Sequence, residues 1–263
     1  MRRGLTGWCD GLKGLALVAG MLTAASGAPA TNAAPAVSPG IPLGQNPPAT
    51  KDGIVYDAAA DFAKSWDAKK NPDGAWKFGW SKGLHGDFVL FPLANVSPIQ
   101  NQRQHVWIDP SNTPAFTPSI RLNDGPDYND GNVDYKAGAL LLHGGGDGWD
   151  CYAHALWTAP DDGSYLVEIV LTGSQYEVNA DAHVLVNGVA SFDAAFTHHG
   201  DQAAYTHIFY FHAGDTVDVA SGLNGDYTPH PGFVAVSAVI QKLKLARPDG
   251  AVVPLLPPAA NNP

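Results

Sequence analysis

The sequence predicts an all-β protein, an antiparallel sandwich or barrel of about ten strands. First, the stretch from Trp157 to Tyr227 alternates β-rich apolar runs with the turn sequences Pro-Asp-Asp-Gly, Asn-Gly, Ala-Gly-Asp and Asn-Gly-Asp. Second, turn signals recur at roughly ten-residue spacing through the rest of the chain. Third, no long amphipathic helical pattern appears.

The first 33 residues have the features of a secretory signal peptide. Arg2, Arg3 and Lys13 supply positive charge, and Leu15 to Ala28 is a short apolar run of mostly small residues before a small-residue cleavage motif. We therefore expect a secreted protein, periplasmic or extracellular after signal-peptide removal. No other stretch approaches the length of a membrane span, so none is expected.

Composition divides the remaining chain into three parts. Residues 34–52 form a Pro-rich linker, 53–246 form the β-sandwich domain, and 247–263 form a Pro-rich tail. The domain is long enough to bury a sizeable core. At its start, Gly53 to Phe62 is compatible with a strand or with a strand that leads into a short helix.

The chain is acidic, with a formal net charge of −10. Removing residues 1–33 takes away three basic residues and one acidic residue, which leaves a net charge of −12. A surface that binds nucleic acid needs a basic patch, so we expect no nucleic-acid partner. After residue 33, seven Asp residues directly precede Gly, a turn-forming pair, so much of the acidity is turn material.

Two local patterns predict buried residues. Trp76, Phe78 and Trp80 alternate along one strand, so we expect these aromatics to pack in the core. Cys151 is the only cysteine left after Cys9 leaves with the signal peptide, and we expect it to be a small buried residue.

The turn and strand-end motifs resemble those of a known domain. The sequences Trp157-Thr158-Ala159-Pro160, Val184-Leu185-Val186-Asn187-Gly188 and Ala213-Gly214-Asp215-Thr216 look like the jelly-roll domain of exported bacterial proteins. That domain is carbohydrate-binding-module-like and is also similar to complement/tumour-necrosis-factor-like jelly rolls. The resemblance implies an antiparallel jelly-roll β-sandwich with a glycan-binding or adhesion role, and it brings no catalytic residues.

The ten histidines form no recognisable metal motif. His207 and His212 lie five apart on one predicted strand and therefore face opposite sides. His198 and His199 are adjacent and diverge in an extended chain. We favour structural or surface roles for the histidines and retain His143, beside a Gly-rich loop, as a candidate ligand-binding residue.

Calcium is a second candidate, because one loop carries several oxygen ligands: Asp124, Asp127, Asp130 and Asp134. Calcium takes about six to eight oxygens, and such a loop supplies several. The spacing does not fit an EF-hand. A solvated acidic turn is the alternative that we favour.

Glycan binding is predicted from aromatics in polar loops, because sugars stack their C–H faces on exposed rings. Tyr128, Trp149 and Tyr227 are each embedded among Gly, Asp or Asn residues. Packing of these rings at the end of the sandwich is the equally weighted alternative. The complete predicted ligand set is His143, Asp147, Trp149, Asp150, Tyr128, Asp226 and Tyr227.

No catalytic motif such as Gly-x-Ser-x-Gly or His-Glu-x-x-His appears. Our leading hypothesis is therefore a secreted non-catalytic binding module for extracellular carbohydrate, with calcium assistance as a further hypothesis. The second is an interaction or structural protein that self-assembles into oligomers, as complement/tumour-necrosis-factor-like jelly rolls do. The third is a polysaccharide hydrolase or lyase whose site is assembled from distant residues.

Overall fold

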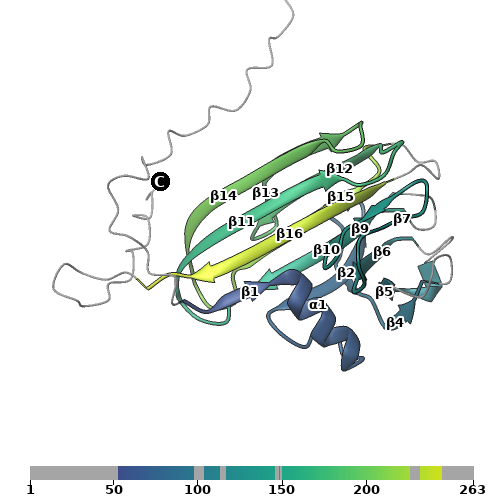
Figure 1. The fold of residues 1–263 in the computed structure, drawn as a ribbon. Coiled ribbons are helices and arrows are strands. Elements are labelled where there is room, and N and C mark those ends of the chain that lie inside the picture. The colour runs from purple at the N-terminus through teal and green to yellow at the C-terminus, as the bar shows by residue number, and fades with distance from the viewer. Residues whose placement is uncertain are drawn as a thin grey trace, which may run out of the picture. The chain divides into compact units, whose positions relative to one another are not determined.

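The computed structural model describes residues 53–97, 104–112, 117–145, 148, 150–225 and 232–244. The predicted signal peptide, most of the linker and the tail lie outside these residues. The described chain forms two large antiparallel sheets, which confirms the all-β prediction (Figure 1). Successive strands alternate between the sheets from β9 to β12 and again from β13 to β16, which is the jelly-roll arrangement.

The first sheet runs in the order β14-β11-β16-β9-β6-β5-β4, and β1 also pairs with β16. Its strands are β1 (Val55–Asp57), β4 (Leu93–Val96), β5 (Gln104–Ile108), β6 (Ser119–Asn123), β9 (Leu140–His143), β11 (Gly163–Gly173), β14 (Gln202–Phe211) and β16 (Phe233–Lys242).

The second sheet runs in the order β13-β12-β15-β10-β2-β3, and β7 and β8 form a separate small hairpin. These strands are β2 (Trp76–Lys82), β3 (Val89–Leu90), β7 (Tyr128–Asn129), β8 (Asp134–Tyr135), β10 (Cys151–Thr158), β12 (Ala180–Val186), β13 (Val189–Phe196) and β15 (Thr216–Gly222). Several of these strands are short, among them β3 with two residues and β4 with four.

The first described residues form a strand and then a helix, α1 (Ala58–Asp67), which lies beside β1 and β2 in Figure 1. Asp57 caps the helix by accepting hydrogen bonds from the backbone of Ala59 at 2.8 Å and Ala60 at 3.1 Å. A 3-10 turn covers Pro110–Asn112. In the described part of the chain, α1 included, no helix has the length and apolar character needed to cross a membrane.

The main core lies between the two sheets and is rich in aromatic rings. Trp157 contacts Tyr165 with ring centroids 5.1 Å apart and Phe211 at 5.6 Å. Trp76 and Phe78 are fully buried as predicted, whereas Trp80 is partly exposed and donates to Asp109 at 3.1 Å. Packing between large flat rings therefore holds the two sheets together.

Two further local predictions are confirmed. Asn187 and Gly188 both have positive φ, 52° and 77°, as a type I′ turn between β12 and β13 requires. Cys151 is buried on the inner side of β10.

Replacing Trp157 by Ala should lower the free energy of unfolding by about 3–5 kcal/mol, because the cavity removes contacts to both sheets. Chemical denaturation monitored by circular dichroism measures this change. Ile208→Ala is the matched control on an exposed side chain and should change stability by about 0.5 kcal/mol or less. Equal effects of the two substitutions would contradict the assignment of Trp157 to the core.

Candidate functional site

Several loops meet at one end of the sandwich, where β11 finishes beside the start of β16. Ser174, the first residue after β11, donates its backbone N–H to Phe233 at 2.9 Å and accepts one from Asp134 at 2.9 Å. Phe233 is in turn the register partner of His143. The strands that flank the predicted loops therefore converge at this end, which we call the loop end.

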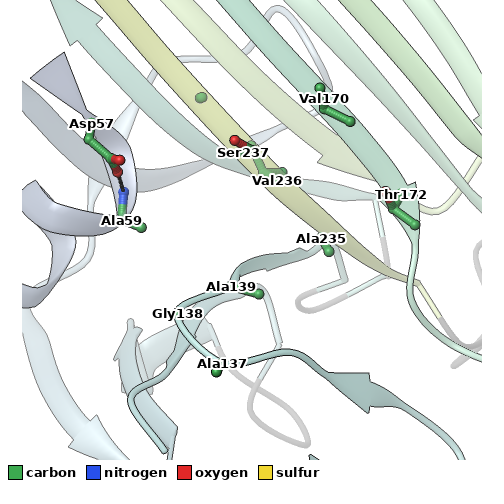
Figure 2. Close-up of a pocket in the computed structure, with 11 residues that line it drawn as sticks. Asp57, Ala59, Ala137, Gly138, Ala139, Val170, Thr172, Ala235, Val236 and Ser237 are labelled. Carbon is green, nitrogen blue, oxygen red and sulfur yellow. Dashed lines mark hydrogen bonds between the residues drawn. The ribbon is translucent and has the colours of Figure 1, made fainter. Parts of the chain in front are cut away.

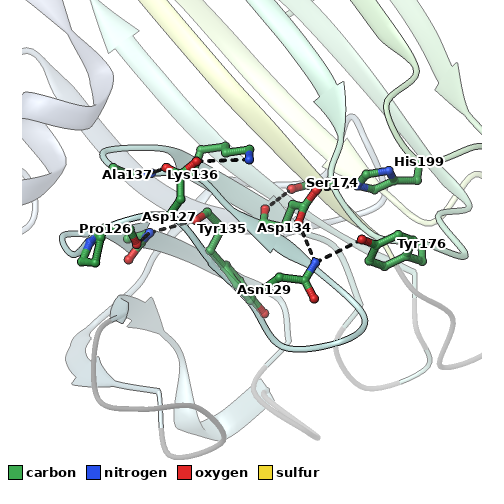
Figure 3. Close-up of polar contacts among 11 residues, drawn as sticks. Pro126, Asp127, Asn129, Asp134, Tyr135, Lys136, Ala137, Ser174, Tyr176 and His199 are labelled. Carbon is green, nitrogen blue, oxygen red and sulfur yellow. Dashed lines mark hydrogen bonds and ion pairs between the residues drawn. The ribbon is translucent and has the colours of Figure 1, made fainter.

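Among the described residues of the loop end, Tyr176 has the most exposed aromatic side chain, with a relative accessibility of 50%. Its ring stacks on His199 with centroids 4.4 Å apart and an interplanar angle of 13°. Asn129 Nδ2 donates to the Tyr176 hydroxyl at 3.2 Å and to Asp134 Oδ1 at 2.6 Å, and His199 Nε2 lies 3.0 Å from Asp134 Oδ2 (Figure 3). We call these four residues the Tyr176 platform.

The platform is held in place by the β7–β8 hairpin. Asn129 Oδ1 accepts the backbone N–H of Gly131 at 2.6 Å, and Asp130 Oδ1 accepts that of Val133 at 2.7 Å. Gly131 has a φ of 91°, a backbone conformation in which a residue with a side chain would be strained. Beneath the turn, Val133 and Tyr135 are buried in a second, smaller core. The backbone hydrogen bonds of the turn and the buried residues beneath it therefore fix the positions of Asn129 and Asp134.

Tyr176 and His199 were not in the predicted ligand set. Tyr176 carries the same sequence signal as Tyr128, because it is an aromatic residue between polar neighbours in a loop. His199 was considered only as a metal ligand. The predicted Tyr128 instead stacks on Tyr135 at 5.9 Å and is partly buried.

His143 lies in the protein interior, with a relative accessibility of 6%. Its ring packs edge-on against Phe233 at 4.4 Å, and Nδ1 contacts the Gly144 carbonyl. Burial lowers the pKa of His143 to about 4, against the opposing effect of the Gly144 contact. His143 is therefore a neutral packing residue, and the structure does not place it on a binding surface.

Asp150 lines a pocket that shares no residue with the Tyr176 platform. Its carboxylate is 3.6 Å from Lys82 Nζ, and its carbonyl accepts the Gly83 N–H at 2.8 Å. The pocket has a volume of about 470 Å³ and is lined also by Cys151 and Tyr152. The other predicted ligand residues, Asp147, Trp149, Asp226 and Tyr227, lie outside the described residues.

The four predicted calcium ligands each have a different partner. Asp124 pairs with His105 at 3.0 Å and Asp127 with Lys136 at 3.2 Å. Asp130 accepts backbone N–H groups, and Asp134 belongs to the Tyr176 platform. Within the described ranges, no group of three or more His, Cys, Asp or Glu side chains could hold a metal ion. Calcium binding stays a prediction that this arrangement does not support.

A charged network crosses the outer face of the second sheet. His183 lies between two carboxylates, with Nδ1 2.6 Å from Asp193 and Nε2 3.0 Å from Asp181. Burial disfavours the imidazolium, but the hydrogen bonds to Asp181 and Asp193 outweigh it and raise the pKa of His183. Tyr152 donates to the same Asp181 at 2.7 Å. Both ring nitrogens of His183 are therefore occupied within the protein.

The first sheet carries a groove of about 240 Å³ on its outer face (Figure 2). Asp57 and Ala59 form one wall, the turn at 137–139 forms the other, and Val170 and Ser237 belong to its lining. None of the lining side chains is aromatic. A sugar would find no ring to stack on there, so the Tyr176 platform is the stronger candidate site.

Comparison with known proteins gives distant structural likenesses. No family model matches the sequence, and no curated protein matches it significantly. The structure is similar to the family 35 carbohydrate-binding module from Clostridium thermocellum, with 18% identity and a TM-score of 0.24 over 34% of this chain and 68% of that chain. It is also similar to CBM51 from Clostridium perfringens GH95 in complex with methyl-galactose, with 10% identity and a TM-score of 0.30 over 72% of this chain and 88% of that one.

A third similar structure is the CBM36-1 domain of a multidomain xylanase from the hindgut metagenome of Trinervitermes trinervoides. The identity is 11% and the TM-score is 0.27, over 44% of this chain and 82% of that chain. At these TM-scores, no residue of this chain is assigned a role from its neighbours. The site is therefore interpreted from its own geometry.

The neutral state of His143 should make stability depend on pH. Its folded-state pKa of about 4 lies below the unfolded value of 6.5, so unfolding takes up a proton between these pH values. The contribution of His143 is fully present above pH 6.5 and is lost as the pH falls through this range, by about 2 kcal/mol at pH 5. Urea denaturation at pH 5 and pH 8 measures the loss.

The control for this prediction is His143→Gln, which cannot titrate at that position. Its free energy of unfolding should change less between pH 8 and pH 5 than that of the wild type. The same pH dependence in both proteins would mean that other groups dominate and that His143 is not held neutral.

Proposed function

We propose that this protein binds carbohydrate through the Tyr176 platform and that it does so outside the cell, as the predicted signal peptide implies. The observation that carries the proposal is the half-exposed ring of Tyr176 surrounded by fixed polar groups. The likeness to carbohydrate-binding modules agrees with the proposal but is too distant to carry it.

The platform offers both kinds of contact that a sugar needs. One face of the Tyr176 ring stacks on His199, which leaves the opposite face and the ring edge for the C–H groups of a pyranose. The Asp134 carboxylate accepts from Asn129 and lies beside His199, and its remaining lone pairs can accept sugar hydroxyls.

The internal contacts of the platform also favour binding energetically. Asn129, Asp134 and His199 are already held by one another, so little side-chain entropy is lost when a ligand binds. Because the polar groups are preorganised beside the ring, a single sugar residue can contact all of them at once.

Tyr176→Ala should weaken glycan binding about tenfold or more, because it removes the stacking surface. Affinity electrophoresis against a panel of soluble polysaccharides, followed by titration calorimetry with the best ligand, measures the change. Tyr210→Ala is the matched control: Tyr210 also lies beside a histidine, His212, but pairs with the opposite end of β11. Its affinity should equal that of the wild type.

Tyr176→Phe separates the ring from its hydroxyl. The ring is kept and only the contact with Asn129 is lost, so most of the affinity should remain. Two results would overturn the proposal: a wild-type protein that binds none of the glycans, or unchanged affinity in Tyr176→Ala.

A further inference from the structure

A Ser-His-Asp arrangement lies on the outer face of the second sheet, apart from the Tyr176 platform. Ser81 Oγ is 2.7 Å from His154 Nε2, and His154 Nδ1 is 2.8 Å from Asp218 Oδ2. The histidine thus contacts the serine with one nitrogen and the carboxylate with the other. This is the connectivity by which a serine is activated as a nucleophile, and it is recognised by geometry rather than by sequence position.

Three neighbouring strands supply the arrangement. Ser81 lies on β2, His154 on β10 and Asp218 on β15, and β10 is hydrogen-bonded to both of the others. Because the residues are far apart in sequence, no short motif could reveal them. Ser81 pairs with Tyr152 and Asp218 pairs with Leu156, two residues before and two residues after His154 on β10. The three side chains therefore lie on a diagonal across the sheet.

The hydrogen atoms can be placed from the chemistry of the partners. Asp218 as a carboxylate only accepts, so His154 Nδ1 carries a hydrogen. In the neutral ring, Nε2 then accepts the Ser81 hydroxyl. The Gly83 carbonyl, 2.6 Å from Ser81 Oγ, is a second acceptor for the same hydrogen. Rotation of the hydroxyl moves the hydrogen between them, and Ser81 is activated when it points to Nε2.

Asp218 has an unusual environment for a purely structural carboxylate. Its relative accessibility is 8%, and Oδ1 has no hydrogen-bond partner among the described residues. A buried carboxylate oxygen without a partner is unfavourable and calls for an explanation, of which a catalytic role is one. A purely structural network would more easily satisfy both oxygens.

Phe88 covers the His154 ring of the triad. Ser81 and His154 have relative accessibilities of 0% and 2%, and the Phe88 ring meets the His154 ring edge-on at 6.0 Å. Gly79 makes room for this ring, because a Cβ there would come within 2.5 Å of it. The pocket of about 470 Å³ is lined by Gly83, whose carbonyl contacts Ser81, and by Tyr152, the register partner of Ser81.

We propose that Ser81, His154 and Asp218 form a nucleophilic triad that cleaves carboxylic esters with small acyl groups when Phe88 moves aside. Ser81 Oγ attacks the ester carbonyl carbon as His154 Nε2 takes the hydroxyl proton. The bond to the alkoxide then breaks, and His154 returns the proton to the leaving alcohol. Water attacks the acyl-serine with His154 as base, which releases the carboxylic acid and restores Ser81.

The test uses the whole chain and a fluorophosphonate, which forms an O–P bond with an activated serine and releases fluoride. Peptide mapping by mass spectrometry should find the label on Ser81 and not on Ser237, which is exposed. Phe88→Ala should increase the rate of labelling, because it removes the cover but leaves the triad. Hydrolysis of 4-nitrophenyl acetate should increase in parallel.

The decisive control combines Phe88→Ala with Asp218→Asn. The side-chain amide that Asp218→Asn introduces can donate to His154 Nδ1, so the ring hydrogen moves to Nε2. Nε2 then cannot accept the proton of the Ser81 hydroxyl. Labelling of Ser81 should fall by about 10³–10⁴-fold relative to Phe88→Ala alone. A near-ultraviolet circular dichroism spectrum matching that of Phe88→Ala shows that the fold is kept, and His154→Gln serves the same comparison if Asp218→Asn does not fold.

Two results would overturn the proposal. One is an unlabelled Ser81 in both the wild type and folded Phe88→Ala. The other is equal labelling of Ser81 with and without Asp218→Asn, which would show that the network does not activate the serine. Neither result depends on glycan binding, because the reagents are small and carry no sugar.

Discussion

The side chains of β10 point alternately into the core and toward the outer face of the second sheet. The rest of the structure depends on this alternation. Ala153, Ala155 and Trp157 face inward and pack against the first sheet, while Tyr152 and His154 face outward. A slip of one residue would exchange the two sets, placing two polar rings in the core and the tryptophan outside. The same register therefore fixes both the aromatic core and the polar networks on the outer face.

Local sequence chemistry explains why the fold was predictable and the site was not. The Asn187-Gly188 turn and the alternating aromatics of β2 each require only neighbouring residues, so periodicity and turn preferences were sufficient. The Tyr176 platform combines residues from β7, β8 and two later loops, and its stacking on His199 depends on how those loops meet. A tyrosine in a polar loop is visible in the sequence, but its exposure is not.

Acidic side chains in the turns also have a structural role, because they accept backbone hydrogen bonds. Asp201 accepts the backbone N–H groups of Thr197 and His198, and Asp162 accepts that of Ala213. These backbone hydrogen bonds lower the pKa of Asp201 and of Asp162. Such carboxylates stabilise the fold at pH values above their pKa in the unfolded chain. This stabilisation is lost as the pH falls through their pKa in the folded protein. Part of the negative charge of the chain thus stabilises turns.

The histidines respond to acid in opposite directions because their surroundings differ. His143 is buried against the Gly144 carbonyl and the Phe233 ring, and burial lowers its pKa, so acid destabilises the fold around it. His183 lies between two carboxylates, so its raised pKa adds stability at low pH that is lost as the pH rises through the pKa of His183 in the folded protein.

His154 differs from both, because one nitrogen faces a carboxylate and the other a hydroxyl. The two carboxylates beside His183 favour its imidazolium form, whereas His154 contacts one carboxylate and one hydroxyl. Of the three, only His154 has the partners that general-base chemistry requires.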